Sequence, residues 1–198
     1  MKLKFKKGFD GDYNKLPSRE VEGAVAFKEP ESIGKLSLIA NSIALLIAVI
    51  LLVPVVIAYG GIKAFTSDIT ASYGQLLIAV VLMIVIMPLH ELLHASCFKG
   101  EVEFYTYLSK GLLFVIGTES MTKARFVFMS LLPNLVFGFL PYVLFFVFPS
   151  QLWLGVLGAV NIASGAGDYI NVFNALTQMP KGSLCFMSRN HSYWYVDN

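Results

Sequence analysis

Long apolar runs separated by short polar segments make up most of the chain. Two of them, residues 36–59 and 75–98, each exceed the roughly 20 helical residues that are needed to cross a hydrocarbon core. Two later runs, 126–148 and 152–176, contain proline, glycine and isolated polar residues but keep the same apolar character. The pattern predicts an all-α membrane protein with about four transmembrane helices.

The segment between the second and third predicted helices, residues 99–125, differs from the runs on both sides. Valine, phenylalanine and tyrosine alternate irregularly with polar residues there, and Gly111 and Gly117 interrupt the segment. Such a pattern favours short strands and turns. We therefore expect a short re-entrant or β-hairpin-like segment close to the membrane surface.

Composition supports a membrane protein. Hydrophobic residues make up 56% of the chain, charged residues 14%, and the mean hydropathy is +0.67, which predicts the lipid bilayer as a partner. The net charge of +2 is too small to favour nucleic-acid binding. We expect a polar cytoplasmic N-terminal segment (1–35), a membrane-embedded domain (36–176) and a cytoplasmic tail (177–198).

Lysine and arginine are distributed unevenly between the predicted helices. Eight precede the first helix and four lie in the segment 99–125, whereas the first loop contains only Lys63 and the turn 149–151 contains none. Because cytoplasmic loops are enriched in basic residues, both termini and the central segment are predicted to be cytoplasmic.

The second apolar run ends with the sequence His90-Glu91-Leu92-Leu93-His94. Residues four apart lie on one face of a helix, so both imidazoles can bind one Zn²⁺ while Glu91 stands beside the open coordination position. Zinc lowers the pKa of a bound water toward roughly 7, and a neighbouring carboxylate can take its proton. This predicts metal-assisted hydrolysis with Glu91 as the general base.

The pattern is specific, because a chain with three histidines matches it by chance in roughly one percent of cases or fewer. Its place in an apolar run adds weight, since ionisable groups at membrane depth cost about 2.5 kcal/mol or more and need a partner or a function. The alternative is a polar cluster that is hydrogen-bonded between helices.

A catalytic zinc ion usually has three protein ligands, so a third is expected. Asp168 is the leading candidate, because it also lies in an apolar run and the charge count places it at a depth similar to that of the histidines. Glu119 and His191 are competing ligands, each in a polar segment that needs no metal to explain it. Asn161 lies two helical turns before Asp168 and is a candidate for substrate or oxyanion contact, although an interhelical hydrogen bond explains it equally well.

The chain resembles the membrane-embedded site-two-protease-like metallopeptidases, and more closely a bacterial family of small integral-membrane proteins described as putative zincin peptidases. The likeness rests on the motif His90 to His94, on Leu131-Leu132-Pro133-Asn134, and on the segment from Asn161 to Asp168. It implies zinc bound by His90, His94 and Asp168, with Glu91 as base, in a bacterial plasma membrane. Ser164 stands where site-two proteases have a proline, which favours the smaller family.

Two functions are consistent with these residues. The first is a zinc metalloprotease that cleaves membrane-associated or membrane-spanning peptides near the cytoplasmic face. The second is a non-catalytic metal-binding membrane scaffold or a transporter-like protein. Glu91 favours the protease, because a structural zinc site needs no general base, and the chain has no clear internal repeat of the kind that transporters show.

Overall fold

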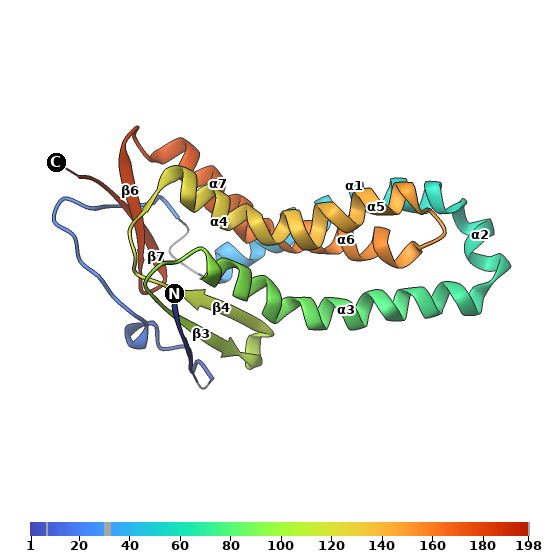
Figure 1. The fold of residues 1–198 in the computed structure, drawn as a ribbon, viewed down its shortest axis with the longest axis horizontal. Coiled ribbons are helices and arrows are strands. Elements are labelled where there is room, and N and C mark those ends of the chain that lie inside the picture. Colours follow the sequence, from blue (N-terminus) through green and yellow to red (C-terminus); the bar gives the residue numbers. More distant parts are fainter. Residues whose placement is uncertain (7, 30–32, 198) are drawn as a thin grey trace. The chain divides into compact units, whose positions relative to one another are not determined.

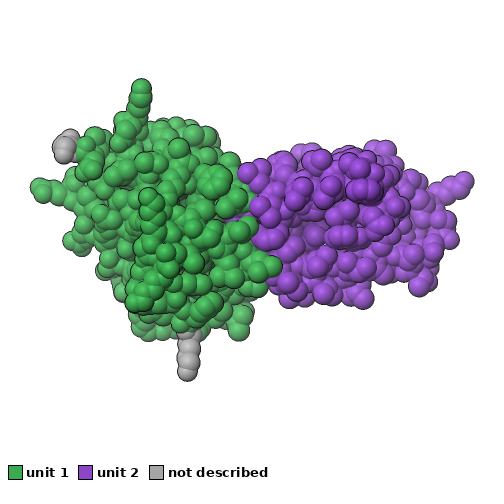
Figure 2. All heavy atoms as spheres, in the orientation of Figure 1, with its two compact units in different colours: residues 1–31, 88–132, 169–198 green, residues 32–87, 133–168 purple. Residues whose placement is uncertain are grey.

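The computed structural model describes residues 1–6, 8–29 and 33–197. The chain forms two compact units that are interleaved along the sequence (Figure 2). Unit 1 comprises Met1–Glu31, Pro88–Leu132 and Tyr169–Asn198, and unit 2 comprises Ser32–Met87 and Pro133–Asp168.

The elements are labelled in Figure 1. The helices are α1 (Ile33–Tyr59), α2 (Gly61–Ser67), α3 (Ile69–Ser96), α4 (Lys123–Pro133), the π-helical segment η3 (Asn134–Phe139), α5 (Leu140–Val147), α6 (Leu152–Ser164) and α7 (Ala166–Gln178). The strands are β1 (Lys2–Phe5), β2 (Val25–Ala26), β3 (Glu101–Tyr107), β4 (Leu112–Ile116), β5 (Met121–Thr122), β6 (Ser183–Ser188) and β7 (His191–Val196). Two short 3₁₀ helices are η1 (Tyr13–Lys15) and η2 (Leu108–Lys110).

Unit 2 is built around α6, against which both α1 and α5 pack. Two glycines on α6 permit these close contacts. A Cβ on Gly155 would lie 2.7 Å from Cγ1 of Val55, and a Cβ on Gly158 would lie 2.5 Å from the backbone nitrogen of Tyr142. Small residues at such contacts let helix backbones approach closely, which is how helices associate when lipid surrounds them.

Three helical stretches of the described residues are long and apolar enough to cross a membrane. They are Ser37–Tyr59, Ile69–Ser96, and Lys123–Val147, which joins α4, η3 and α5. Only 6% of the most apolar window of each of the first two stretches is buried. Exposed apolar surface on this scale is typical of a membrane contact.

The fourth apolar run does not form one long helix. Gly165 follows the end of α6, where its N–H donates to the carbonyl oxygen of Ile162 at 3.3 Å, and the chain restarts as α7. Each of the two helices has 13 residues, which span about 20 Å rather than the roughly 30 Å of a hydrocarbon core. The prediction of four transmembrane helices is therefore not confirmed.

A three-stranded sheet in unit 1 has the order β1-β3-β4. Strands β3 and β4 are antiparallel neighbours joined through η2, so the hairpin predicted between the second and third apolar runs is confirmed (Figure 1). Strand β1 runs parallel to β3, with Lys2 opposite Glu101 and Lys4 opposite Glu103. Oppositely charged residues on neighbouring strands stabilise the pairing of the polar N-terminal segment with this sheet.

A second sheet of unit 1 has four strands in the order β2-β7-β6-β5. Its centre is the hairpin of β6 and β7, which pair antiparallel from Ser183 opposite Val196 to Ser188 opposite His191. The protein is mostly helical but not all-α, and the predicted class is corrected in this respect. The reason is local, because aromatic and apolar side chains on both sides of a two-residue turn form a hairpin rather than a loose polar tail.

The core of unit 1 connects the helices to both sheets. Ala95 of α3, Met129 of α4 and Ala175 of α7 are buried in one cluster with Val102 of β3 and Cys185 of β6. Burial of these apolar side chains fixes the last turns of α3 against α4. The predicted zinc motif lies on those turns.

The substitution Gly158→Ala tests the close packing of α6 against α5. The new methyl group would meet backbone atoms of Tyr142, which cannot move aside as a side chain can. We expect the free energy of unfolding to fall by about 2 kcal/mol or more, measured by thermal unfolding in detergent. Gly74→Ala is the matched control, because nothing lies within 4 Å of its Cβ position in α3. Equal stability of Gly158→Ala and wild type would contradict the packing.

Candidate metal centre

The three motif residues lie on the last part of α3, which ends at Ser96. Pro88 precedes them in the same helix. Because proline has no N–H, the helix loses the hydrogen bond that residue 88 would donate to the carbonyl of Ile84. The motif therefore begins directly after a local break in the helical hydrogen bonds.

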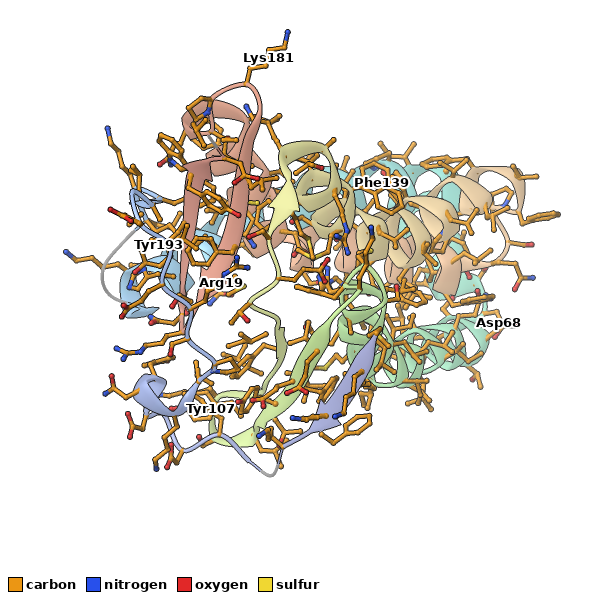
Figure 3. The ribbon with its side chains drawn as sticks, turned by 60° about the vertical axis from the view of Figure 1, so that its left-hand side comes forward. Arg19, Asp68, Tyr107, Phe139, Lys181 and Tyr193 are labelled. Carbon is orange, nitrogen blue, oxygen red and sulfur yellow. The ribbon has the colours of Figure 1, made fainter. Side chains whose placement is uncertain are left out.

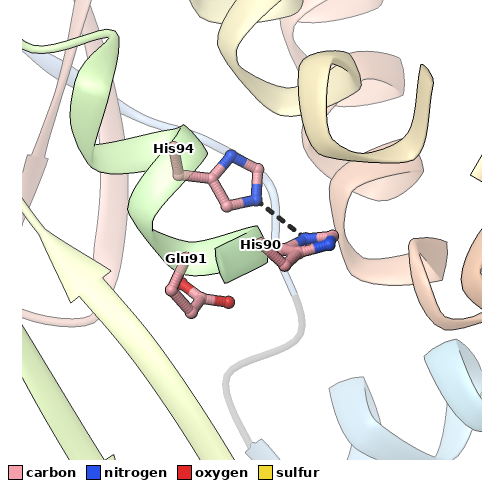
Figure 4. A group of neighbouring side chains, drawn as sticks. All are labelled: His90, Glu91 and His94. Carbon is pink, nitrogen blue, oxygen red and sulfur yellow. Dashed lines mark hydrogen bonds between the residues drawn. The ribbon is translucent and has the colours of Figure 1, made fainter. Parts of the chain in front are cut away.

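The side chains of His90, Glu91 and His94 converge, as the spacing predicted. Their possible ligand atoms all lie within 4.8 Å of one another, and Nε2 of His94 is 3.1 Å from Nε2 of His90 (Figure 4). His94 is buried, and the other two are half-buried. The group therefore has polar atoms on one face of α3 that are partly shielded from solvent.

A backbone hydrogen bond determines the tautomer of His94. Its Nδ1 lies 2.9 Å from the carbonyl oxygen of Met129 on α4. A carbonyl oxygen can only accept, so Nδ1 carries the proton and donates it. In the neutral ring Nε2 then holds a lone pair, which is the state that a metal ligand requires.

The two histidines fit a zinc ion. A tetrahedral Zn²⁺ with Zn–N bonds of 2.0–2.1 Å holds two ring nitrogens about 3.3 Å apart, close to the 3.1 Å between the two Nε2 atoms. Metal binding would replace the hydrogen bond between these atoms, and His90 would then carry its proton on Nδ1. The chemistry of the donor set, two imidazoles and a carboxylate, is also what zinc prefers.

Asp168 lies in the first turn of α7, at the end of unit 2, and its Oδ2 accepts a hydrogen bond of 2.9 Å from Nδ2 of Asn134. Asn134 is 1% exposed, and its Oδ1 has no hydrogen-bond partner among the described residues. A Cβ on Gly165 would lie 2.0 Å from that oxygen, so only glycine leaves room for Asn134 there. The structure thus gives Asp168 a positioned carboxylate, and its place as third ligand stays a prediction.

Asn161 is buried in α6, where its Nδ2 donates to the carbonyl oxygen of Leu157 at 2.8 Å. This is a bond to the preceding turn of its own helix rather than the predicted bond between helices. A role in contacting substrate stays a prediction.

Glu119, one of the competing ligands, is engaged elsewhere in unit 1. Its Oε2 accepts from the backbone N–H groups of Lys99 and Gly100 at 2.6 and 2.9 Å, and its Oε1 accepts from Nη1 of Arg125 at 2.6 Å. Burial raises the pKa of Glu119, but the hydrogen bonds from Gly100, Arg125 and Lys99 outweigh it and hold the pKa below its usual value.

The Glu119 network also holds the end of α3. Arg125 donates through Nε to the carbonyl oxygen of Cys97 at 3.0 Å, and Cys97 follows the last residue of α3. A cation at a helix C-terminus satisfies carbonyl groups that have no partner within the helix. Glu119 and Arg125 together therefore fix the end of the helix that carries the motif.

His191, the second competing ligand, begins β7, and its Nδ1 lies 3.7 Å from Oε2 of Glu29.

The sequence did not identify Met129 or Arg125 as residues that support the site. A backbone carbonyl such as that of Met129 leaves no mark in the sequence. Arg125 was easier to notice in the sequence, because it is a cation directly before an apolar run.

A family model described as "Putative zincin peptidase" matches residues 83–184, slightly more than half of the chain. The chain belongs to this family. The match includes the motif on α3 and extends through Asn161 and Asp168. No curated protein and no solved structure gives a match. The zincin peptidase family implies zinc, and the group of His90, Glu91 and His94 provides a possible site for it.

In this member of the zincin peptidase family we expect Glu119→Gln to have the same zinc content as wild type while losing stability. The carboxylate binds Lys99, Gly100 and Arg125 rather than a metal, so the variant should unfold more easily by about 1–2 kcal/mol. Metal analysis and thermal unfolding of the purified protein measure both quantities. Arg125→Gln is the matched control, because it breaks the same ion pair and leaves the carboxylate. If Glu119→Gln loses zinc and Arg125→Gln keeps it, Glu119 is a ligand.

Proposed function

We propose that this protein is a membrane-embedded zinc metalloprotease that hydrolyses peptide bonds of membrane-associated or membrane-spanning substrates near the cytoplasmic face. The observation that carries the proposal is the approach of the two Nε2 atoms of His90 and His94 to 3.1 Å with the Glu91 carboxylate beside them. Membership of the zincin peptidase family supports the same chemistry.

The roles of the residues follow from their chemistry. His90 and His94 would hold the metal through Nε2, and the hydrogen bond to Met129 keeps the lone pair of His94 on Nε2. Zinc supplies a Lewis acid that lowers the pKa of a bound water toward about 7. Glu91 takes the proton of the attacking water and returns it to the leaving amine.

Asp168 is proposed as the third ligand. Its carboxylate accepts from Asn134, and the amide of Asn134 is itself held against Gly165. An outer hydrogen bond of this kind orients a ligand oxygen and raises metal affinity. Asn161 is proposed to contact the substrate.

The membrane location rests on three apolar helical stretches and on the charge count. One of the stretches, Ile69–Ser96, is the helix that carries the motif at its end. The basic residues concentrated before α1 and between α3 and α4 favour a cytoplasmic position for that end. Water and substrate would therefore reach the motif from the cytoplasmic side.

An extended peptide could bind along β4. Among the described residues β4 pairs with β3 alone, so its other edge offers backbone groups to a further strand. Val115 of β4 packs against the core cluster that contains Ala95 of α3, which brings this strand close to the motif helix. Proteins commonly hold a peptide by adding it as a strand to a sheet edge.

Glu91→Gln tests the catalytic proposal. The substitution keeps the size of the side chain and removes the base, so bound zinc should stay equal to that of wild type while cleavage of membrane peptides falls by about 10²-fold or more. The measurements are metal analysis and cleavage of a library of single-span peptides in proteoliposomes. Glu22→Gln, at an exposed position of unit 1, is the matched control. If wild type and Glu91→Gln both bind zinc and behave identically in every cleavage assay, the protease hypothesis is wrong and the protein is a non-catalytic metal-binding scaffold.

Asp168→Ala tests the ligand set. Removing a direct ligand should weaken zinc binding by more than the roughly 10- to 100-fold that loss of an outer hydrogen bond costs. Asn134→Ala, which removes only the outer bond, should fall within that range. Competition with a chelator of known affinity measures both. Unchanged affinity in Asp168→Ala together with lost affinity in His191→Ala would assign the third ligand to His191.

A further inference from the structure

Unit 1 contains a cavity of about 460 Å³ that lies outside the metal centre. Its walls come from the segment after η1 and from the β6–β7 hairpin. The charged and aromatic residues of the lining are Arg19, Glu20, Phe186, Arg189, His191 and Tyr193. A volume of this size is in the range of small-molecule sites. Nothing in the proposed protease chemistry uses it.

Hydrogen bonds tie the two walls together. The N–H of Arg19 donates to Oγ of Ser188 at 3.0 Å, and the N–H of Arg189 donates to the carbonyl oxygen of Pro17 at 2.8 Å. The cavity is therefore a built feature of the unit rather than a gap beside a loose segment.

Arg189 has an unusual backbone conformation. Its φ of 55° makes it the one described residue other than glycine with a positive φ. Glycine or asparagine is the usual choice in this region, and another residue there costs free energy. Arg189 is the first residue of the two-residue turn between β6 and β7, where such turns use a positive φ, and it lines the cavity.

One wall of the cavity is aromatic. Phe186 is buried, and its ring stacks on Tyr193 with centroids 5.5 Å apart and an angle of 18° between the planes. The guanidinium of Arg19 lies 5.4 Å from the centroid of the Phe186 ring, and its Nη1 donates to the carbonyl oxygen of Thr118 at 3.0 Å. Arg19 is thus held in place by two contacts while most of its five N–H donors remain for other acceptors. Figure 3 shows Arg19 and Tyr193 close together in this part of the unit.

The charge of the lining is predominantly basic. Two arginines, Arg19 and Arg189, line the cavity together with one acidic residue, Glu20. Arginine pairs bidentately with planar or tetrahedral oxyanions. A phosphate monoester has three acceptor oxygens and a charge of about −1.5 to −2, so it can satisfy two arginines better than a single carboxylate can.

We propose that this cavity binds a phosphate monoester of nucleotide size, with the phosphate held by Arg19 and Arg189 and a flat ring system against the half-buried ring of Tyr193. The cavity volume exceeds what a bare phosphate fills, and base stacking on aromatic side chains is a common mode of binding. The proposal does not depend on the protease function. The same phosphate chemistry could come from a soluble nucleotide or from a lipid headgroup.

The experiment uses the full chain in detergent, titrated with adenosine monophosphate in a calorimeter, and in nanodiscs with and without phosphatidic acid. We expect saturable binding of the nucleotide and no comparable binding of adenosine. If only phosphatidic acid binds, and Arg189 is required, the phosphate site belongs to a lipid headgroup and the nucleotide proposal is overturned.

Arg189→Asn is the decisive variant, because asparagine accepts the left-handed backbone and only the guanidinium is lost. It should weaken binding roughly 10- to 100-fold. Lys181→Asn removes the same charge from an exposed position outside the cavity and should bind as wild type does (Figure 3). The proposal is overturned if neither phosphate probe binds, if adenosine binds as tightly as the nucleotide, or if Arg189→Asn binds as tightly as wild type.

Discussion

The candidate metal centre depends on one hydrogen bond, from Nδ1 of His94 to the carbonyl oxygen of Met129. It sets the tautomer, and with it the lone pair on the nitrogen that faces His90. The bond exists only because α4 lies against the last turns of α3, and two features hold the helices there. One is the buried cluster that contains Ala95 and Met129. The other is Arg125, which binds the carbonyl of Cys97 just beyond the helix end. The chemistry of two residues on one helix is thus controlled from the neighbouring one.

Much of this site could be predicted from the sequence. A spacing of four residues places His90 and His94 on one helical face whatever surrounds the helix, and the irregular segment after it does form a hairpin. The role of Met129 could not be predicted, because every residue has a backbone carbonyl and only tertiary packing selects one. The β6–β7 hairpin was missed although a signal was present: two runs of six residues are separated by the two residues Arg189 and Asn190.

The division of the last apolar run into two helices was not predicted, because the whole run is apolar in character. Hydropathy averages over a window, so a single glycine such as Gly165 does not interrupt the run. The structure gives it a specific contact, because it leaves space for Asn134, which binds Asp168. A buried asparagine at the start of a π-helical segment is the kind of local irregularity that marks functional sites. The division of the sequence at residues 35 and 176, the cytoplasmic termini and the relation to site-two proteases all stay predictions.

X-ray absorption at the zinc edge of the purified protein tests the central claim most directly. The account predicts a four-coordinate zinc with two imidazole nitrogens at about 2.0–2.1 Å and oxygen in the remaining positions. A sulfur ligand at about 2.3 Å would contradict the predicted oxygen ligands and would indicate Cys97, which lies just past the end of α3. A spectrum with no imidazole scattering would contradict the pairing of His90 with His94 altogether.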